Sequence, residues 1–521
     1  MVGKRIRAAS LVLAVTASAL VAAPASAAPG TATPANPGFE ADAAGVAGPA
    51  GWVERGDAAA GYTEAGGHTG DFRLTHSAAQ PYRVDTSQRL TGLRRGTYTL
   101  RAWVRSSGDQ RSAHLALRGC GGPDQRVGLP TTGDEWWVQV ALSTRVTRGT
   151  CTVAVSSDSA AGGWLHVDDV QFAPTRGAQG DRVAIQGADV SHLTKNEDHG
   201  AVYRDRTGRP RDALSILRAN GVNYARLKVW VDPVDGYNNK ADTLAKARRA
   251  KALGMRLLIN FHYSDAWADP GKQNKPAAWA DLPFEGLRQA VYDHTYDVIA
   301  ALRAQRTPAD MVQVGNEING GMLWPDGRWD NWDNLAALLT AGSTAVTAAS
   351  PSTKVVLHLA EGGDNEGHRW WFDNAVSRGV PFDIIAVSHY VYWHGPLGSL
   401  QANLFDLAQR YDRPVMVVET AYGFTTEEND HEANIFTAAL AERGGYPATP
   451  RGQSDALRDI LTVVAGVPNA LGVFYWEPTW TAVDGAGWDP ADPASGDGWE
   501  NQALFDYTGR ALPAMRVFAE F

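Results

Sequence analysis

The chain has 521 residues, 44% of them hydrophobic and 20% charged, which is enough for one large domain and a smaller one. Its formal net charge of −9 at pH 7 disfavours nucleic acid and anionic lipid as partners. The 18 Trp and 54 Gly residues favour a neutral carbohydrate, because aromatic faces stack on sugar rings; Trp that merely packs over loops is the alternative.

The first 27 residues show the order of a secretory signal. Three cations within the first seven residues precede an Ala-rich apolar stretch that ends in Ala25, Ser26 and Ala27. We expect cleavage near Ala27 and a secreted, extracellular monomer without a membrane partner. A membrane anchor is the alternative, but the stretch is short, and no later segment is apolar enough to span a bilayer.

Residues 34–173 alternate short apolar runs with turns rich in Gly, Asp, Ser and Thr. Runs such as TYTLRAWV, WWVQVAL and CTVAVSS have the period of two that is typical of strands, which predicts an all-β sandwich. Both cysteines of the chain, Cys120 and Cys151, lie in this region. We expect them to form one disulfide in an exported protein, although two separate thiols remain the alternative, because spacing does not show proximity.

Residues 174–182 lack periodicity and contain Pro and Gly, which indicates a linker. In residues 183–521, eight strand candidates recur between amphipathic stretches: AIQGADV, YARLKVW, LLINFH, MVQVGNE, VVLHLAE, IIAVSHY, VMVVET and GVFYWE. This eightfold alternation predicts a (β/α)8 barrel, an α/β fold. An open doubly wound sheet is the competing topology, but no Gly-rich phosphate loop follows the first strand candidate.

Functional groups of such a barrel gather where its strands end. Strand candidate four ends in Asn316 and Glu317, and strand candidate seven ends in Glu419. Strands four and seven face one another, and two carboxylates about 5 Å apart suit retaining glycoside hydrolysis. Glu361 and Glu477, at the ends of strands five and eight, are the rival carboxylates.

The other polar groups at the rim are expected to assist this pair. Arg226 would keep Glu419 ionised, unless it only forms an ion pair in the core. Asn316 would bind a sugar hydroxyl or else cap a helix. No HExxH motif supports metal binding, so we assign hydrogen-bonding roles to His262, His389 and Tyr390 and, with a structural role as the alternative, to His358. The aromatic candidates for sugar subsites are Trp267, Trp393, Trp476 and Trp480.

Several segments in order from about residue 185 to the C-terminus resemble the endo-β-1,4-galactanases of glycoside hydrolase family 53, also called arabinogalactan endo-1,4-β-galactosidases. They are GADVSHL, NYARLKVWVDP, NFHYSDAWADPGKQNKPAAW, VQVGNEINGGMLWPDG, FDIIAVSHYVYWHG, VVETAYGF, GVFYWEPTW and NQALFDYTGRALPAMRVF. The resemblance implies a retaining (β/α)8 enzyme whose acid/base and nucleophile match Glu317 and Glu419. It also implies a substrate, the β-1,4-galactan side chains of pectic arabinogalactan, cut internally.

The resemblance further implies a structural Ca²⁺ in the loop after strand seven, TTEENDHEAN, whereas catalysis needs no cofactor. The matching ligand positions are Glu427, Asn429, His431, Asp497 and Glu500. Glu, Asn and Asp supply the oxygen ligands that Ca²⁺ prefers. Ala433 stands where the family has Asn, and a solvated acidic loop is the alternative.

The N-terminal region resembles jelly-roll carbohydrate-binding modules through NPGFE at 36–40 and WLHVDDVQF at 164–172. Its candidates for sugar stacking are Trp52, Trp136, Trp137 and Trp164, with packing in the sandwich core as the alternative. Two other functions stay open for the whole chain. One is hydrolysis of another β-linked polysaccharide by an enzyme of the same clan, and the other is galactan binding without catalysis.

Overall fold

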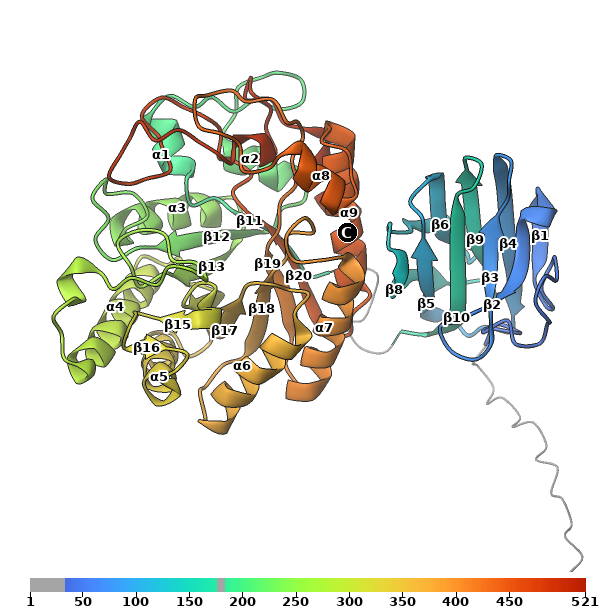
Figure 1. The fold of residues 1–521 in the computed structure, drawn as a ribbon, viewed down its shortest axis with the longest axis horizontal. Helices are drawn as coiled ribbons and strands as arrows, with labels where there is room; N and C mark the ends of the chain where they lie inside the picture. Colours follow the sequence, from blue (N-terminus) through green and yellow to red (C-terminus); the bar gives the residue numbers. More distant parts are fainter. Residues whose placement is uncertain (1–32, 176–182) are drawn as a thin grey trace, which may run out of the picture.

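The computed structural model describes residues 33–175 and 183–521, which form a β-sandwich and a barrel (Figure 1). The expected signal segment, 1–27, and nearly all of the expected linker, 174–182, lie outside the described residues. Within the described ranges, no helix is long and apolar enough to cross a membrane.

The sandwich consists of two five-stranded antiparallel sheets, with strand orders β1-β4-β9-β6-β7 and β2-β3-β10-β5-β8. The prediction of an all-β domain before the barrel is therefore confirmed. Its strands are β1 (Val53–Gly56), β2 (Gly61–Ala65), β3 (Phe72–Ser77), β4 (Tyr82–Thr91), β5 (Gly96–Ser106), β6 (Gln110–Arg118), β7 (Gln125–Gly128), β8 (Gly133–Val146), β9 (Thr150–Ser159) and β10 (Trp164–Pro174).

Alternation along these strands separates a packed core from an outward face. In β5, Leu100, Ala102 and Val104 are buried in the core, whereas the residues between them point outward. Trp52 is 6% exposed and contacts Phe39, so it packs in the core rather than on a sugar-binding surface. The structure joins Cys120 and Cys151 in a disulfide.

The second domain is a closed barrel in the order β11-β12-β13-β14-β17-β18-β19-β20, and its strands pair in parallel. This closure confirms the predicted (β/α)8 fold and excludes the open doubly wound sheet. The barrel strands are β11 (Ile185–Asp189), β12 (Tyr224–Val229), β13 (Arg256–Phe261), β14 (Met311–Val314), β17 (Lys354–Leu359), β18 (Ile384–Ser388), β19 (Val415–Glu419) and β20 (Ala470–Tyr475).

Helices surround the barrel, and several begin at side-chain caps, such as Asp364 before α6 and Thr449 before α9. Helix α3 ends before Gly254, whose φ of 71° suits glycine. The α-helices are α1 (Leu193–Asp198), α2 (Ala213–Ala219), α3 (Lys240–Ala252), α4 (Phe284–Ala304), α5 (Trp332–Ala349), α6 (Asn365–Ser377), α7 (Leu397–Tyr411), α8 (Ala438–Gly444) and α9 (Pro450–Ala465). Short elements complete the chain: η1 (Ala58–Ala60), η2 (Ala277–Trp279), η3 (Ile318–Gly320), β15 (Gly321–Met322), β16 (Gly327–Arg328), η4 (Glu500–Gln502) and η5 (Pro513–Glu520).

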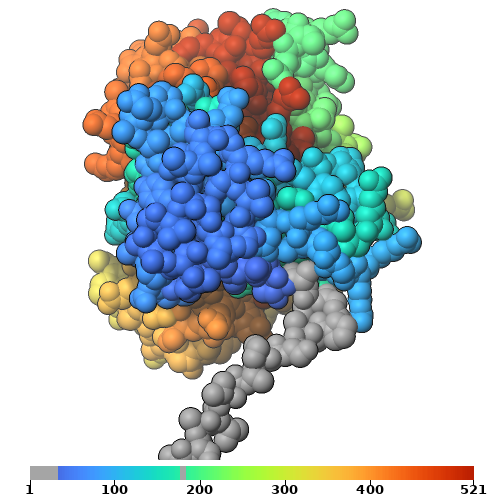
Figure 2. Space-filling view, turned by 90° about the vertical axis from the view of Figure 1, so that its right-hand side faces the viewer, coloured from blue at the N-terminus to red at the C-terminus, as the bar shows by residue number. Residues whose placement is uncertain are grey.

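The sandwich lies against α7 and α9 of the barrel, and Figure 2 shows its blue and cyan atoms in front of the barrel. The backbone N–H of Gln139 donates to the side-chain oxygen of Gln401 at 2.6 Å, and the Gln401 amide donates back to the Gln139 carbonyl at 2.9 Å. The N–H of Thr131 donates to Asp459 at 3.1 Å. These hydrogen bonds join the two domains through both backbone and side-chain groups.

Candidate active site

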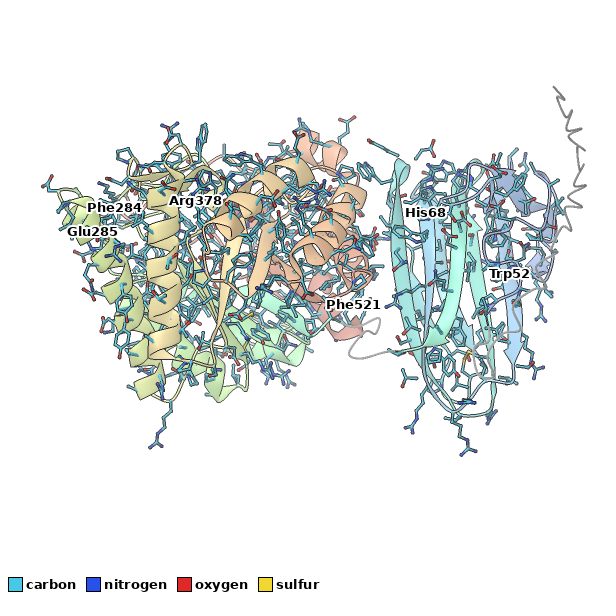
Figure 3. All side chains as sticks on the ribbon, turned by 90° about the horizontal axis from the view of Figure 1, so that it is seen from below. Trp52, His68, Phe284, Glu285, Arg378 and Phe521 are labelled. Carbon is cyan, nitrogen blue, oxygen red and sulfur yellow. A yellow bond between two sulfur atoms is a disulfide. The ribbon has the colours of Figure 1, made fainter. Side chains whose placement is uncertain are left out.

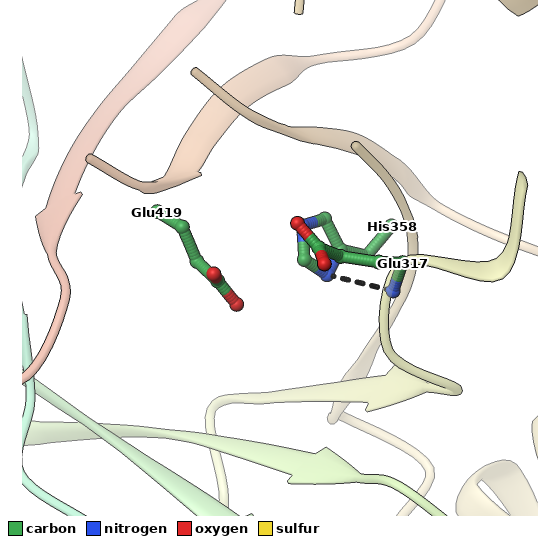
Figure 4. Close-up of side chains that lie close together, drawn as sticks. All are labelled: Glu317, His358 and Glu419. Atoms are coloured by element: carbon green, nitrogen blue, oxygen red, sulfur yellow. Dashed lines mark hydrogen bonds between the residues drawn. The ribbon is translucent and has the colours of Figure 1, made fainter. Parts of the chain in front are cut away.

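Glu317 and Glu419 lie together at the C-terminal rim of the barrel, as Figure 4 shows. Glu419 is the last residue of β19, and Glu317 follows β14 with a φ of 48°, a left-handed conformation that non-glycine residues rarely adopt. One carboxylate oxygen of each and a ring nitrogen of His358 lie within 4.8 Å of one another. This is the close spacing of carboxylates that retaining glycosidases use.

His358 orients Glu317 and is not free to bind a metal. Its Nδ1 accepts from the Gln313 amide at 2.8 Å and from the Glu317 backbone N–H at 3.3 Å. Its Nε2 lies 2.8 Å from the Ser388 hydroxyl. Both ring nitrogens are therefore occupied, so the three side chains act as a carboxylate pair with a histidine that positions one of them.

Arg226 distinguishes the two carboxylates electrostatically. Its guanidinium is fully buried and lies 2.8 Å from Glu419 and 2.8 Å from Asp189. Tyr390 donates a hydrogen bond to Glu419 at 3.0 Å. These contacts stabilise Glu419 as a carboxylate and oppose the effect of burial, which raises its pKa.

Glu317 forms no ion pair with any residue that the structure describes, and burial, followed by repulsion from Glu419, raises its pKa to about 8. Near neutral pH, burial and Glu419 therefore favour the protonated form of Glu317, whereas Arg226 and Tyr390 favour the ionised form of Glu419. A protonated carboxyl facing an ionised one is the arrangement that an acid/base and a nucleophile require.

The rival carboxylates have other surroundings. Glu477 is fully buried and contacts Lys228 at 3.4 Å and the His192 backbone N–H at 3.2 Å. Glu361 lies at the edge of the cleft but is exposed to solvent. Neither has the combination of burial, a facing carboxylate and an arginine that distinguishes Glu317 and Glu419.

A cleft of about 350 Å³ surrounds the pair and brings most of the predicted substrate-binding residues together. The predicted residues that line it are His262, Trp267, Asn316, Tyr390, Trp393 and Trp476. Asp269, His394 and Trp499 also line the cleft and were not among our predictions. A larger hollow of about 680 Å³ lies between α4 and α5, but its lining contains no pair of carboxylates.

The remaining predicted residues lie behind the cleft walls. Arg226 and His389 are fully buried, and Trp480 stacks against the indole of Trp267 with ring centroids 5.6 Å apart. Asn316 lines the cleft, but its amide already bonds Arg226 at 2.9 Å and the Ala268 carbonyl at 2.9 Å. These contacts fix Asn316 beside Glu317 rather than leaving its amide free.

The residues suggested as Ca²⁺ ligands come from the loop after β19 and the segment after β20, and they divide into exposed and buried groups. Glu427, Asn429 and His431 are exposed, whereas Asp497 and Glu500 are buried. One carboxylate oxygen of each buried residue has no hydrogen-bond partner, and the same holds for the side-chain oxygen of Asn434. Asp430 was not among the predicted ligands, and its carboxylate accepts a hydrogen bond from the Asp497 N–H at 2.7 Å. Unpartnered buried oxygens fit a hard cation such as Ca²⁺.

Comparison with known proteins agrees with this geometry. The sequence model of glycosyl hydrolase family 53 matches residues 185–518. A protein of Bacillus subtilis (strain 168) named endo-beta-1,4-galactanase is 36% identical over 374 residues, which cover 64% of this chain and 85% of that protein. An arabinogalactan endo-beta-1,4-galactanase of Thermothelomyces thermophilus is 33% identical over 344 residues, covering 64% of this chain and 99% of the relative.

A solved structure has the same architecture. The family 53 catalytic domain of Ignisphaera aggregans superposes with a TM-score of 0.62 at 43% identity, covering 64% of this chain and 95% of that domain. The matched family region extends over the whole closed barrel and includes both carboxylates and Arg226. The chain therefore belongs to glycosyl hydrolase family 53 and is a glycoside hydrolase.

Proposed function

We propose that this chain is a secreted, retaining endo-β-1,4-galactanase that cuts the galactan side chains of pectic arabinogalactan internally. The observation that carries the proposal is the buried pair of Glu317 and Glu419, of which only Glu419 lies 2.8 Å from Arg226, in an aromatic cleft. Relatives named endo-beta-1,4-galactanases support the choice of substrate. Export rests on the signal-like first 27 residues, and the mass of the mature protein should show cleavage near Ala27.

The mechanism follows from the protonation of the pair. Glu317 donates its proton to the glycosidic oxygen while Glu419 attacks the anomeric carbon, which gives a covalent glycosyl-enzyme and releases the leaving chain. Water then attacks the anomeric carbon, and Glu317, now ionised, removes the proton of that water. Arg226 and Tyr390 align Glu419 and keep it ionised for its attack, and they stabilise the carboxylate that is released when water cleaves the intermediate.

Product analysis on linear β-1,4-galactan and on β-1,3-linked galactan tests both the linkage and the nucleophile. Wild type should release short galacto-oligosaccharides from the β-1,4 polymer alone, and Glu419→Ala should release none because no group attacks the anomeric carbon. Faster release of reducing ends from mannan, xylan or β-glucan would contradict the substrate. Binding of galactan without any hydrolysis would instead support the silent binding protein.

We further propose that Ca²⁺ binds between the loop after β19, where Asn434 would supply an oxygen, and the segment after β20, where Asp497 and Glu500 would supply others. The ion would fix the loop that carries Trp499 into the cleft and would take no part in bond cleavage. A chelator should lower the midpoint of thermal unfolding, and added Ca²⁺ should restore it. Mg²⁺ at the same concentration is the control, and an unchanged midpoint after chelation would remove the proposal.

The sandwich is proposed to be a carbohydrate-binding module that keeps the enzyme at its polysaccharide. A second site on the same chain raises the local concentration of substrate without any new contact in the catalytic cleft. Of the four candidate tryptophans, Trp52 lies in the core and Trp136 packs against Gly398 of the barrel. Trp137 and Trp164 remain as candidates on the outward face.

A further inference from the structure

The barrel buries a lysine behind one wall of the catalytic cleft. Side chains fill the interior of the barrel domain (Figure 3), and Lys228, on β12, is only 2% exposed there. Burial lowers the pKa of Lys228 to about 8 against the opposing effects of Glu477 and Asp189, so the group is still an ammonium at neutral pH. A charge removed from water is costly unless its partners offset the loss, so the partners of Lys228 require an explanation.

The ammonium of Lys228 has three N–H groups and three close partners. Its Nζ lies 3.1 Å from Nδ1 of His192 and 3.4 Å from a carboxylate oxygen of Glu477. The third partner is aromatic, because Nζ lies 3.5 Å from the centroid of the Trp267 ring. The ring of Trp230 is more distant, at 5.1 Å. Lys228 therefore makes a short cation–π contact with Trp267 in a site closed to water, where such a contact contributes most.

Neighbouring strands fix the position of this ammonium. His192 follows β11, Lys228 lies on β12 and Glu477 follows β20, and these three strands are adjacent in the barrel. Burial and the charge of Lys228 lower the pKa of His192 well below its usual range, so its neutral ring accepts from the ammonium. Glu477 also accepts from the His192 backbone N–H at 3.2 Å. None of the three side chains lines the cleft, so they support it from behind.

Trp267 lies between this charged group and the cleft. It comes from the loop after β13, is half-buried and lines the cleft. Its Nε1 donates to the Trp488 carbonyl at 2.9 Å, which fixes one edge of the indole but leaves the ring able to tilt about that edge. The ammonium over one face opposes this tilt. Because Lys228 is closed to solvent, the face that covers it is closed as well, and the ring presents its remaining surface to the cleft.

We propose that Lys228 is a positioning residue that holds the indole of Trp267 in the orientation that stacks on a sugar ring, and that Glu477 holds Lys228 in place. Neither residue touches substrate. This inference rests on the proposed function for the identity of the sugar, but it requires only that Trp267 contacts the saccharide that the barrel hydrolyses. It also gives Glu477, which is not one of the catalytic carboxylates, a role in substrate binding.

A double-mutant cycle with Trp267→Ala tests the inference in the full chain. Lys228→Met with Glu477→Gln, the neutral-pair variant, removes both charges and nearly keeps the side-chain volumes. It should raise KM on β-1,4-galactan about two- to thirtyfold and change kcat less, because a cation–π contact that orients the ring is lost. Trp267→Ala alone should raise KM at least as much. Combining the neutral pair with Trp267→Ala should add nothing further, since no ring is left to position.

The matched control is Lys246→Met with Asp242→Asn, which removes another buried ion pair. Lys246 is 1% exposed and lies 2.8 Å from Asp242, and its ammonium donates to the Ser191 carbonyl and to the side chain of Asn238 in place of an indole. The control should lower the midpoint of thermal unfolding without raising KM. Lys228→Gln with Glu477→Gln, which replaces the ion pair by two amides, serves if the neutral-pair variant does not fold.

Two results would overturn the inference. One is an unchanged KM in the neutral-pair variant, and the other is an equal rise in KM with and without Trp267, because the effect would then not pass through the indole. Hydrolysis of mannan, xylan or β-glucan in place of galactan would contradict only the proposed substrate, and the same cycle on that polymer would decide the role of Lys228. A chain that cut none of the four polymers would contradict both.

Discussion

Glu317→Gln should lower kcat on β-1,4-galactan by about 10²- to 10⁴-fold, because the glycosidic oxygen then departs without a proton. Gln has nearly the shape of Glu, and the hydrogen bond from the backbone N–H of residue 317 to His358 does not involve the side chain, so the fold should survive. A dinitrophenyl galactobioside, whose leaving group needs no proton, should lose far less in the glycosylation step. Single-turnover rates on the two substrates measure this difference.

The same variant should also change the pH profile. Burial and Glu419 raise the pKa of Glu317 to about 8, so wild-type kcat/KM should fall as pH rises through about 8 and the proton is lost. In Glu317→Gln acting on the dinitrophenyl substrate, this alkaline decline should be absent. Glu361→Gln, which changes an exposed carboxyl at the edge of the same cleft, is the matched control and should retain the alkaline decline. If Glu317→Gln lost as much rate on the dinitrophenyl substrate as on galactan, Glu317 would not be the acid.

Periodicity was sufficient to predict the fold and the carboxylate pair, because both depend on local patterns. Each barrel strand is a short apolar run, and the parallel strands of a closed barrel end at one rim. Glu317 and Glu419 stand where two such runs stop, so their convergence follows from the fold alone. The direction of a side chain at a strand end does not follow from the fold: we predicted both His389 and Tyr390 to bind substrate, but only Tyr390 lines the cleft, and His389 is fully buried.

Features that depend on distant loops and on register could not be predicted from the sequence. Trp499 reaches the cleft from a long stretch after β20 that has no periodic pattern. In the sandwich, Arg73 on β3 and His166 on β10 are far apart in the sequence, and only the pairing of these strands shows that they are neighbours. Alternation alone marks such residues as outward and therefore as solvated, whereas the structure shows them buried.

Arg226→Met should reduce both activity and stability, because it leaves Asp189 and Glu419 buried without their shared cation. Removing one partner of a buried ion pair costs about 3–5 kcal/mol of unfolding free energy. Without the guanidinium, burial raises the pKa of Glu419 further, so the acid decline of kcat/KM should move toward neutral pH. Urea unfolding and the pH profile measure the two effects separately.

A second substitution distinguishes the catalytic effect of Arg226 from its structural one. Adding Asp189→Asn to Arg226→Met removes one uncompensated charge, so it should restore part of the lost stability. It should not restore activity, since Glu419 still lacks the cation that keeps it ionised. Arg226→Lys should be intermediate, because a single ammonium cannot reach Glu419, Asp189 and Asn316 together as the planar guanidinium does. If activity recovered together with stability in the double variant, Arg226 would act on the fold alone, and the ionisation of Glu419 would need another cause.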